Sequence, residues 1–453
     1  MAERLFGTNG VRGVVNEYMD VQLAMDVGKA IGTFMKGRVA IGCDSRTSAD
    51  MVRSACAAGL MSAGAEVLDL GLLPTPALQY FVKIGDVAGG VMITASHNPP
   101  EFNGIKAIDS DGTEMPREKE LAIEEIYFQK RFSAPDWRKV GTSARSAGAI
   151  ATYQKAVLGN VDRKAIREAG LKVVLDCANG AGSVCTPRIL EELGVRTMTL
   201  NCNPLGTFPG HPSEPTEDHL HDLITLVRET GADLGIAHDG DADRTIFIDD
   251  KGRFVHGDRS LAVVAGAMVA ENDGGIVVTP VSTSLCVEEV VKRAGGELVY
   301  TRVGAPIVAR KMIELDAVFG GEENGGLIFP EHQHCRDAAM TAAKMIEILA
   351  VEGSLSSLLD KVPHYCLDKR KLKCPEDAKE DVLKAVCEAF ADQRVDATDG
   401  VKVYFEGGWT LIRPSGTEPI FRIYSEGRTE QRAREIADRC EKVVKEILGS
   451  ISR

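Results

Sequence analysis

The sequence lacks the features that mark several specialised classes of protein. Its 11 cysteines, scattered from Cys43 to Cys440, include no CxxC pair and no cysteine–histidine cluster with zinc spacing. An odd number of cysteines without such a framework is typical of reduced thiols in the cytosol. The first residues, MAERLFGTNGVRG, lack the apolar core of a signal peptide. We therefore expect a cytoplasmic protein.

Long apolar runs and an excess of positive charge are also missing. No run approaches the roughly 18 apolar residues of a membrane-spanning helix. The formal net charge of −13 argues against broad binding to nucleic acid or anionic membranes, which need basic surfaces. An anionic small substrate is still compatible with this charge, provided that a local basic pocket exists.

A repeated pattern of strands and helices is present instead. The 453 residues suggest three or four domains. Three regions share the order strand, helix, strand, helix, strand and polar loop; they begin at RVAIG, KVVLDC and GIVVTP and end at the loops ASHNPPEFNG, HDGDADR and GEENGG. Short apolar strands that alternate with helices predict largely parallel sheets, in which ligands gather at the carboxyl ends of the strands. We therefore expect the three loops to occupy equivalent places in three similar domains.

The last segment follows a different pattern. From about Leu367 it predicts a charged helix, then the strands VKVYF, GWTLIRP and IFRIY, and finally an amphipathic helix. The predicted fold is therefore three similar α/β domains with mixed, mostly parallel sheets, plus a C-terminal α+β domain. The predicted boundaries are 1–150, 151–252, 253–365 and 366–453.

The loop HDGDADR favours a metal site. Asp239, Asp241 and Asp243 alternate with small residues and are followed by Arg244. Three carboxylates this close repel one another unless a cation holds them, and hard oxygen ligands suit Mg²⁺. The other interpretation is a solvated acidic turn.

The loop RPSGTEP has the groups that a phosphate dianion requires. Arg413, Ser415 and Thr417 surround Gly416, and Arg422 lies in the following strand. A guanidinium, two hydroxyls and the amides of a glycine turn can all donate to phosphate oxygens. An ordinary turn with an exposed arginine is the other interpretation.

The loop GEENGG presents Glu322 and Asn324 between glycines. These side chains can hydrogen-bond the hydroxyls of a sugar, although a flexible acidic turn has the same composition. TASHNPPEFNGIK supplies Ser96 without the G-x-S-x-G elbow of a serine hydrolase. A serine that acts with a metal site and a phosphate pocket indicates phosphoryl chemistry instead.

Three further residues belong to this hypothesis. His97 adjoins Ser96 and is either a structural histidine or a hydrogen-bonding partner of the serine group. Lys106 can return to Ser96 if the loop folds over. Arg12, at the end of the glycine-rich LFGTNGVRG, is a candidate phosphate contact, or else a cap or surface residue.

Taken together, TASHNPPEFNGIK, DGDADR, GEENGG and RPSGTEP resemble, in this order and spacing, the motifs of the α-D-phosphohexomutases. The resemblance extends over essentially the whole chain. It implies a heart-shaped, four-domain enzyme with the active site in a central cleft and one loop from each domain. It also implies a reversible transfer of phosphate between positions 1 and 6 of a hexose, through a bisphosphorylated sugar that also serves as activator.

The resemblance implies a role for each candidate. Ser96 would be phosphorylated and, with Asp239, Asp241 and Asp243, would bind one Mg²⁺. Arg244 would hold the phosphoserine or the substrate, and Lys106 and Arg12 match acid/base and phosphate-contact positions. Glu322 and Asn324 would bind sugar hydroxyls, and Arg413, Ser415 and Thr417 the non-reacting phosphate. The predicted domains would thus be the phosphoserine, metal, sugar and phosphate domains, in a monomer or homodimer that binds sugar phosphates.

Some positions depart from the family pattern. Gly326 stands where some members have histidine, and Ala305 replaces another polar residue, which leaves the second acid/base open; His332 and His334 are possible substitutes. LFGTNGVRG resembles phosphoglucosamine mutases, so we favour glucosamine phosphates, with mannose or glucose phosphates as the alternative. Two other classes are a haloacid-dehalogenase-type phosphatase with Asp241 as nucleophile, because DADRT fits D-x-D-x-T, and a non-catalytic sugar-phosphate sensor.

Overall fold

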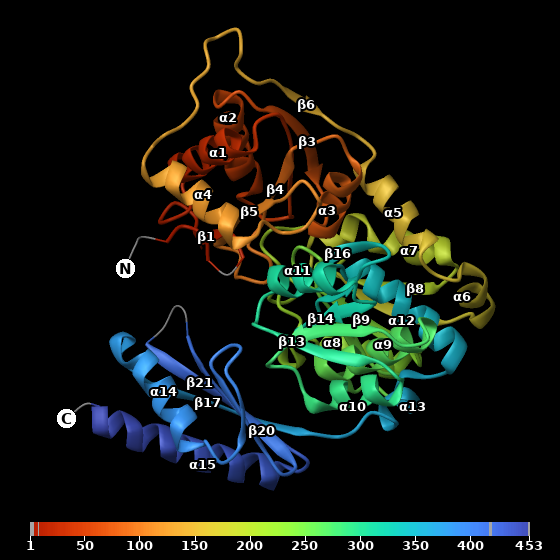
Figure 1. The fold of residues 1–453 in the computed structure, drawn as a ribbon. Coiled ribbons are helices and arrows are strands. Elements are labelled where there is room, and N and C mark those ends of the chain that lie inside the picture. Colours follow the sequence, from red (N-terminus) through yellow and green to blue (C-terminus); the bar gives the residue numbers. More distant parts are fainter. Residues whose placement is uncertain (1–3, 8, 416–418, 452–453) are drawn as a thin grey trace.

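The structure, a computed structural model, describes residues 4–7, 9–415 and 419–451. Within these residues the chain forms four β-sheets, which follow one another along the sequence (Figure 1). None of the helices in these ranges is both long and apolar enough to cross a membrane.

The first sheet has the strand order β1-β5-β4-β2-β3-β6. Its strands are β1 (Val11–Val14), β2 (Arg38–Cys43), β3 (Glu66–Leu72), β4 (Gly89–Ile93), β5 (Phe102–Ile108) and β6 (Ser143–Arg145). The helices of this part are α1 (Val21–Met35), α2 (Ala49–Ser62), α3 (Thr75–Ile84) and α4 (Arg117–Phe128). Strands β4, β2, β3 and β6 run parallel, whereas β5 and β1 run antiparallel to their neighbours.

The second sheet has the order β11-β10-β9-β7-β8 and the third the order β13-β12-β14-β15-β16. The second part contains α5 (Ala149–Gly159), α6 (Arg163–Ala169), β7 (Lys172–Asp176), η1 (Ala181–Val184), α7 (Thr186–Leu193), β8 (Arg196–Leu200), η2 (Glu217–His219), α8 (His221–Thr230), β9 (Leu234–His238), β10 (Thr245–Ile248) and β11 (Phe254–Val255). The third part contains α9 (Gly257–Glu271), β12 (Ile276–Pro280), α10 (Leu285–Arg293), β13 (Glu297–Thr301), α11 (Ala305–Leu315), β14 (Phe319–Gly321), β15 (Leu327–Phe329), β16 (Gln333–Arg336), α12 (Ala338–Glu352) and α13 (Leu355–Asp360).

The three sheets repeat one arrangement. In each, a central strand (β2, β7 or β12) lies between two parallel strands, and the second of these (β4, β9 or β14) pairs with an antiparallel strand (β5, β10 or β15). The strands of the parallel core are mostly buried and apolar, as expected for strands covered on both faces. The predicted fold class is confirmed for these three parts.

The fourth sheet, β17-β21-β20-β19-β18, is antiparallel throughout. It consists of β17 (Cys366–Lys373), β18 (Arg394–Asp396), β19 (Val401–Phe405), β20 (Gly408–Pro414) and β21 (Ile420–Gly427), with η3 (Glu376–Ala378), α14 (Lys379–Ala389) and α15 (Glu430–Ile451). In Figure 1 both helices lie on one side of this sheet.

The charged helix expected from about Leu367 begins only at Lys379, as α14, and the start at Leu367 is wrong because Cys366–Lys373 is strand β17. It pairs with β21 over its whole length, from Cys366 opposite Gly427 to Lys373 opposite Ile420. Charged side chains are compatible with such an edge strand, where they also hinder unwanted pairing. In addition, Nη1 of Arg370 lies 2.7 Å from carboxylate oxygens of Asp438 and Glu441 on α15, so tertiary ion pairs outweigh the helical preference of this lysine- and arginine-rich segment.

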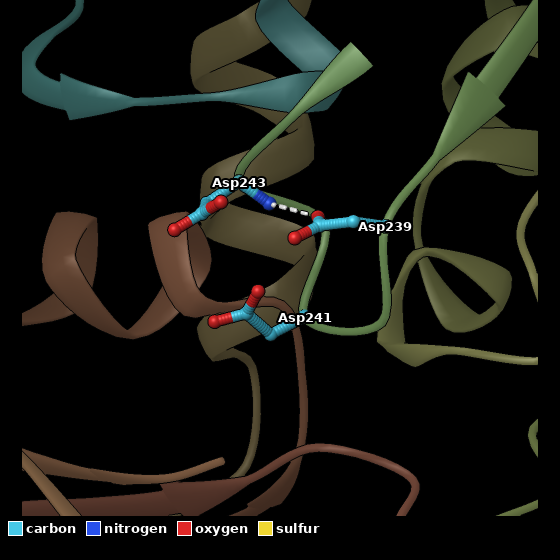
Figure 2. A group of neighbouring side chains, drawn as sticks. All are labelled: Asp239, Asp241 and Asp243. Atoms are coloured by element: carbon cyan, nitrogen blue, oxygen red, sulfur yellow. Dashed lines mark hydrogen bonds between the residues drawn. The ribbon is translucent and has the colours of Figure 1, made fainter. Parts of the chain in front are cut away.

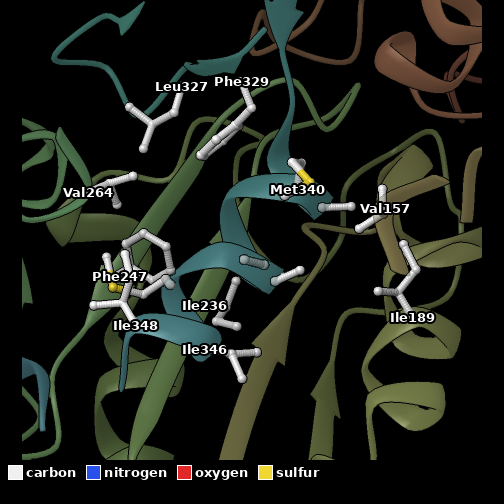
Figure 3. Close-up of a cluster of buried hydrophobic side chains, with 14 of the residues drawn as sticks. Val157, Ile189, Ile236, Phe247, Val264, Leu327, Phe329, Met340, Ile346 and Ile348 are labelled. Atoms are coloured by element: carbon white, nitrogen blue, oxygen red, sulfur yellow. The ribbon is translucent and has the colours of Figure 1, made fainter. Parts of the chain in front are cut away.

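Helix α12 lies at the centre of the largest hydrophobic core. Figure 3 shows Met340 and Ile346 of this helix near Ile236 of β9 and Val157 of α5. The helix follows the third sheet but packs against elements of both the second and the third. The second and third parts therefore share one core. This core fixes the positions of the loops at the ends of their strands relative to one another.

Candidate active site

The polar loops follow the same strand in each of the three α/β sheets. The serine loop (94–101) joins β4 to β5, the metal loop (239–244) joins β9 to β10, and the sugar loop (322–326) joins β14 to β15. Each starts at the carboxyl end of the last parallel strand and leads into the antiparallel one. This equivalence agrees with the pattern found in the sequence.

Lys106 reaches the site by a route that differs from the expected one. It does not lie in a loop that folds over; FNGIKAI is strand β5, in which Lys106 pairs with Met92. The strand returns antiparallel to β4, so Lys106 lies at the same end of the sheet as Ser96. Asn103, Gly104 and Lys106 obscured this strand in the sequence because they are unusual in a buried strand.

Ser96 lies against the metal loop. Its hydroxyl Oγ donates a hydrogen bond of 2.9 Å to Oδ2 of Asp239. The residue is buried and has a φ of 52°, a left-handed conformation that is uncommon for a residue other than glycine and that tends to occur at functional sites. Its backbone N–H donates to Thr94 Oγ1 at 2.8 Å, which helps to hold this turn.

The three aspartates form one buried cluster, the metal cluster, shown in Figure 2. One oxygen of each lies within 4.8 Å of the others. Asp239 Oδ1 accepts the backbone N–H groups of Asp243 and Arg244 at 3.1 and 3.2 Å, which closes the loop around the cluster. Ala242 has a φ of 57°, a left-handed conformation that is uncommon for a residue other than glycine.

The cluster fits the coordination of a magnesium ion. Asp241 Oδ1 and Asp243 Oδ1 are buried and accept no hydrogen bond from the described residues. A buried carboxylate oxygen without a hydrogen bond is costly, and a hard cation removes that cost. Asp239, Asp241 and Asp243 are therefore the residues that would hold the ion.

Lys106 is held as an ammonium by this cluster. Its Nζ lies 2.8 Å from Asp241 Oδ2 and 3.4 Å from Asp243 Oδ2. Burial alone would lower the pKa of Lys106, but the two carboxylates outweigh this and raise it. A general base needs the opposite shift, so in this arrangement Lys106 is suited to donate a proton or to neutralise charge.

Lys106 also keeps Asp241 ionised. Burial favours the neutral carboxyl, but the ammonium and the hydroxyl of Thr75, 2.7 Å from Asp241 Oδ2, lower the pKa of Asp241. Among the described residues, no lysine or arginine forms an ion pair with Asp239, and burial, followed by the charges of Asp243 and Asp241, raises its pKa.

Arg12 contacts the serine loop, and His97 is part of it. Arg12 Nη1 donates to the carbonyl oxygen of Ala95 at 3.2 Å and to Asn98 Oδ1 at 3.0 Å. His97 Nδ1 lies 3.3 Å from Ser96 Oγ. Burial, together with the charges of Arg244 and Arg12, lowers the pKa of His97 to about 3, so its imidazole is neutral at physiological pH. A neutral imidazole can orient the serine group by hydrogen bonding.

The sugar loop is tied to the metal loop by an arginine. Glu322 Oε2 accepts hydrogen bonds from Arg336 Nη1 at 2.9 Å and from Asn324 Nδ2 at 3.4 Å. Arg336 also contacts Asp243. Arg244 of the metal loop also lies beside Asp243, with its Nε 3.7 Å from Asp243 Oδ1.

The fourth loop follows β20. Arg413 and Arg422 are opposite each other in the β20–β21 register, an arrangement of like charges that an anion between them would stabilise. Arg413 Nε lies 2.9 Å from Asp399 Oδ2. Ser415 is buried, and its carbonyl oxygen accepts a hydrogen bond from Lys379. The expected phosphate contacts Gly416 and Thr417 lie outside the described residues.

The sequence interpretation missed residues that support Ser96. Arg46 Nη2 donates to the carbonyl oxygens of Ser96 and Asn98 at 2.8 and 2.6 Å, and its Nε lies 3.2 Å from Asp44 Oδ2. Asp44 in turn accepts from Thr94. The polar run DSRTS directly after β2 could have indicated these residues, because it too starts at the carboxyl end of a central strand.

Of the two histidines considered as substitutes, His332 is engaged with other residues. The ring of His332 stacks on Tyr80, with centroids 5.0 Å apart, and its Nε2 lies 3.2 Å from Asp337 Oδ2. The pKa of His334 is lowered by burial, with Lys83 adding to the effect.

A buried hydroxyl beside a carboxylate cluster that fits Mg²⁺, with several cations around it, defines a site for phosphoryl transfer. Comparison with known proteins gives the family. Phosphoglucomutase/phosphomannomutase alpha/beta/alpha domains I, II and III match residues 3–134, 151–252 and 256–365, and the C-terminal domain matches residues 371–443. The chain therefore belongs to the phosphoglucomutase/phosphomannomutase family of α-D-phosphohexomutases.

Individual relatives match over almost their whole length. A phosphoglucomutase/phosphomannomutase of Thermococcus kodakarensis is 43% identical, with 98% of this chain and 99% of the relative covered. A probable phosphoglucosamine mutase of Methanopyrus kandleri is 41% identical, with 99% of each covered. The crystal structure of a phosphoglucomutase/phosphomannomutase family protein from Burkholderia thailandensis superposes with a TM-score of 0.89 at 25% identity, covering 98% of this chain and 97% of that one.

Proposed function

We propose that this phosphohexomutase interconverts glucosamine 6-phosphate and glucosamine 1-phosphate through a phosphoserine at Ser96 and a bisphosphorylated sugar. The observation that carries the proposal is the contact between Ser96 Oγ and the metal cluster, 2.9 Å from Asp239 Oδ2. A hydroxyl in this position can carry a phosphate whose oxygens lie next to a cation. Mg²⁺ held by the three aspartates and the phosphate would polarise that phosphate as a Lewis acid.

The proposed reaction has two transfers of the same kind. In the first, the bond between Ser96 Oγ and phosphorus breaks, a sugar oxygen bonds to that phosphorus, and the hydroxyl proton of the sugar passes in net terms to Ser96 Oγ. The second transfer returns the other phosphate of the bisphosphorylated sugar to Ser96. Catalysis of this kind depends mainly on positioning and on neutralising the phosphoryl oxygens. Lys106, Arg12 and Arg244 provide the positive charge.

The remaining loops are proposed to bind the sugar. Glu322 and Asn324 are assigned to its hydroxyl groups, since they are the polar side chains of the sugar loop. Arg413, Ser415, Gly416, Thr417 and Arg422 are assigned to the phosphate that is not being transferred. The opposed arginines of β20 and β21 support this assignment.

The choice of sugar rests on the relatives and on the opening motif. The relative from Methanopyrus kandleri is named as a probable phosphoglucosamine mutase, whereas that from Thermococcus kodakarensis is named for glucose and mannose phosphates. The opening motif LFGTNGVRG favours glucosamine phosphates. The name of the Thermococcus kodakarensis relative gives the alternative substrate, a mannose or glucose phosphate.

A substrate panel tests the choice. The 1- and 6-phosphates of glucosamine, glucose, mannose and N-acetylglucosamine are assayed separately, each with a hexose bisphosphate to prime the enzyme. We expect the highest kcat/KM with the glucosamine phosphates. Activity confined to mannose and glucose phosphates would instead establish the alternative.

A further inference from the structure

A buried arginine outside the predicted motifs joins two of the site loops. Arg336 is the last residue of β16 and only 5% exposed. Its Nη1 donates to Glu322 Oε2 at 2.9 Å, and its Nη2 donates to Asp243 Oδ2 at 2.5 Å. A single guanidinium therefore bridges the sugar loop of the third sheet and the metal loop of the second.

The arginine passes through a space that Gly326 leaves open. A Cβ at position 326 would lie 2.1 Å from Arg336 Cδ and 2.9 Å from Cγ, so any side chain there would displace the arginine. Gly326 does not have the left-handed φ that favours glycine. Position 326 therefore requires glycine because the Arg336 side chain needs the space, and not because of the backbone conformation.

The bridge fixes the orientation of Asp243. Arg336 and Lys106 both contact Asp243 Oδ2, while Oδ1 is buried without a hydrogen bond from the described residues. Holding one oxygen of a carboxylate leaves the other available to a metal ion in a defined direction. Groups that orient metal ligands in this way contribute roughly 10- to 100-fold to metal affinity or activity.

We propose that Arg336 is a positioning residue, which holds the metal cluster and the sugar loop in one fixed arrangement, and that Gly326 is there to let its side chain pass. The proposal rests on the proposed function for the roles of the two loops. A sugar hydroxyl held by the sugar loop must face the phosphate on Ser96, and a displacement of about 1 Å can reduce the rate about 100-fold. The planar fork of arginine can contact two carboxylates at once, whereas the ammonium of lysine is a point charge.

Two variants test this proposal from opposite sides. Arg336→Lys keeps the charge but loses the bridge, and Gly326→Ala keeps Arg336 but blocks its path. In each we expect the Kd for Mg²⁺, measured by calorimetry on the protein without substrate, to rise about 10-fold or more, and kcat to fall about 10- to 100-fold. KM should change less, because the phosphate-binding loop is untouched. The double variant should be no worse than the more severe single one, since both remove the same contact.

Gly159→Ala is the matched control. Gly159 ends α5, has no left-handed φ, and has nothing within 4 Å of an added Cβ, so this variant should behave as the wild type. Wild-type Mg²⁺ affinity and kcat in Arg336→Lys would overturn the proposal. If Arg336→Lys does not fold, the result with Gly326→Ala decides whether Arg336 is a positioning residue. If neither variant folds while Gly159→Ala does, Arg336 is needed for folding, and the positioning role is rejected as well.

The same experiment separates this inference from the proposed function. A wild type that turns over no hexose phosphate would reject the function, while the Mg²⁺ titrations would still decide the role of Arg336. An active wild type with unaffected variants would reject the inference alone.

Discussion

At the scale of single residues, the sequence neighbours of Ser96 explain little of its setting. His97 is adjacent and within 3.3 Å, yet the hydroxyl donates to Asp239, which is 143 positions away. The residue types of the four motifs predicted that Ser96 acts with the aspartates. A carboxylate cluster binds a cation, and a serine next to that cation can carry a phosphate. Arg336 was not predicted, because its hydrogen bonds depend on tertiary positions that no local motif encodes, whereas Arg46 was overlooked in the polar run that follows β2.

The phosphate-binding assignment of Arg413 gives a prediction at this scale. Arg413→Ala should raise KM for a hexose phosphate about 10- to 150-fold, corresponding to roughly 1.5–3 kcal/mol for hydrogen bonds to a charged group. Phosphate incorporation at Ser96 should persist, since the serine loop belongs to another sheet. Steady-state kinetics and intact-mass measurement provide the two readouts.

Arg432→Ala serves as the comparison for this variant. Arg432 lies on α15, where it pairs with Glu435 at 3.3 Å, and it is outside the proposed site. An unchanged KM in Arg413→Ala would remove Arg413 from the phosphate-binding residues.

At the scale of elements, the strands of the parallel cores were predictable, whereas strands such as β5 and β17 were not. Apolar runs such as GGVMI and KVVLD have the composition of buried strands, and the structure places β4 and β7 there. β5 was hidden because its buried positions include Asn103 and Lys106, which serve the site rather than the core. β17 was hidden because its charges are neutralised by α15, a contact between distant segments.

The end of β9 gives a pH prediction. His238 is buried between the hydroxyls of Thr245 and Thr186, each 3.1 Å away. Burial lowers its pKa to about 4, against the opposing charges of Asp337 and Asp176. The unfolded chain takes up this proton near pH 6.5 and the folded chain only near pH 4, so the free energy of unfolding falls as the pH falls through this window.

His238→Gln should reduce that acid sensitivity. The difference in unfolding free energy between pH 7 and pH 4.5, measured by chemical denaturation, should be smaller than in the wild type by about 2–3 kcal/mol. A variant of the exposed His364 provides the control. Equal differences in His238→Gln and the wild type would show that His238 does not make this contribution.

At the scale of the whole molecule, the three α/β parts differ from the fourth in how they are joined. The largest core takes residues from all three α/β parts, with α12 between the second and third, whereas the C-terminal sheet has a core of its own with α14 and α15. Contacts such as Lys402 Nζ to the carbonyl oxygen of Val281, at 2.6 Å, join the C-terminal part to the third. The repeat in the sequence predicted the similarity of the parts, but their shared core follows from packing that becomes visible only in three dimensions.

The central claim is that Ser96 carries the phosphate that is transferred, and intact-mass measurement of the purified enzyme tests it most directly. We predict a fraction of the protein with one phosphate, located at Ser96 by peptide mapping and exchanged on addition of a hexose phosphate. In Ser96→Ala both the phosphate and the turnover should be lost, whereas the exposed Ser143→Ala should keep both. Phosphate on Asp241, as in a haloacid-dehalogenase-type phosphatase, or full turnover in Ser96→Ala, would contradict the account.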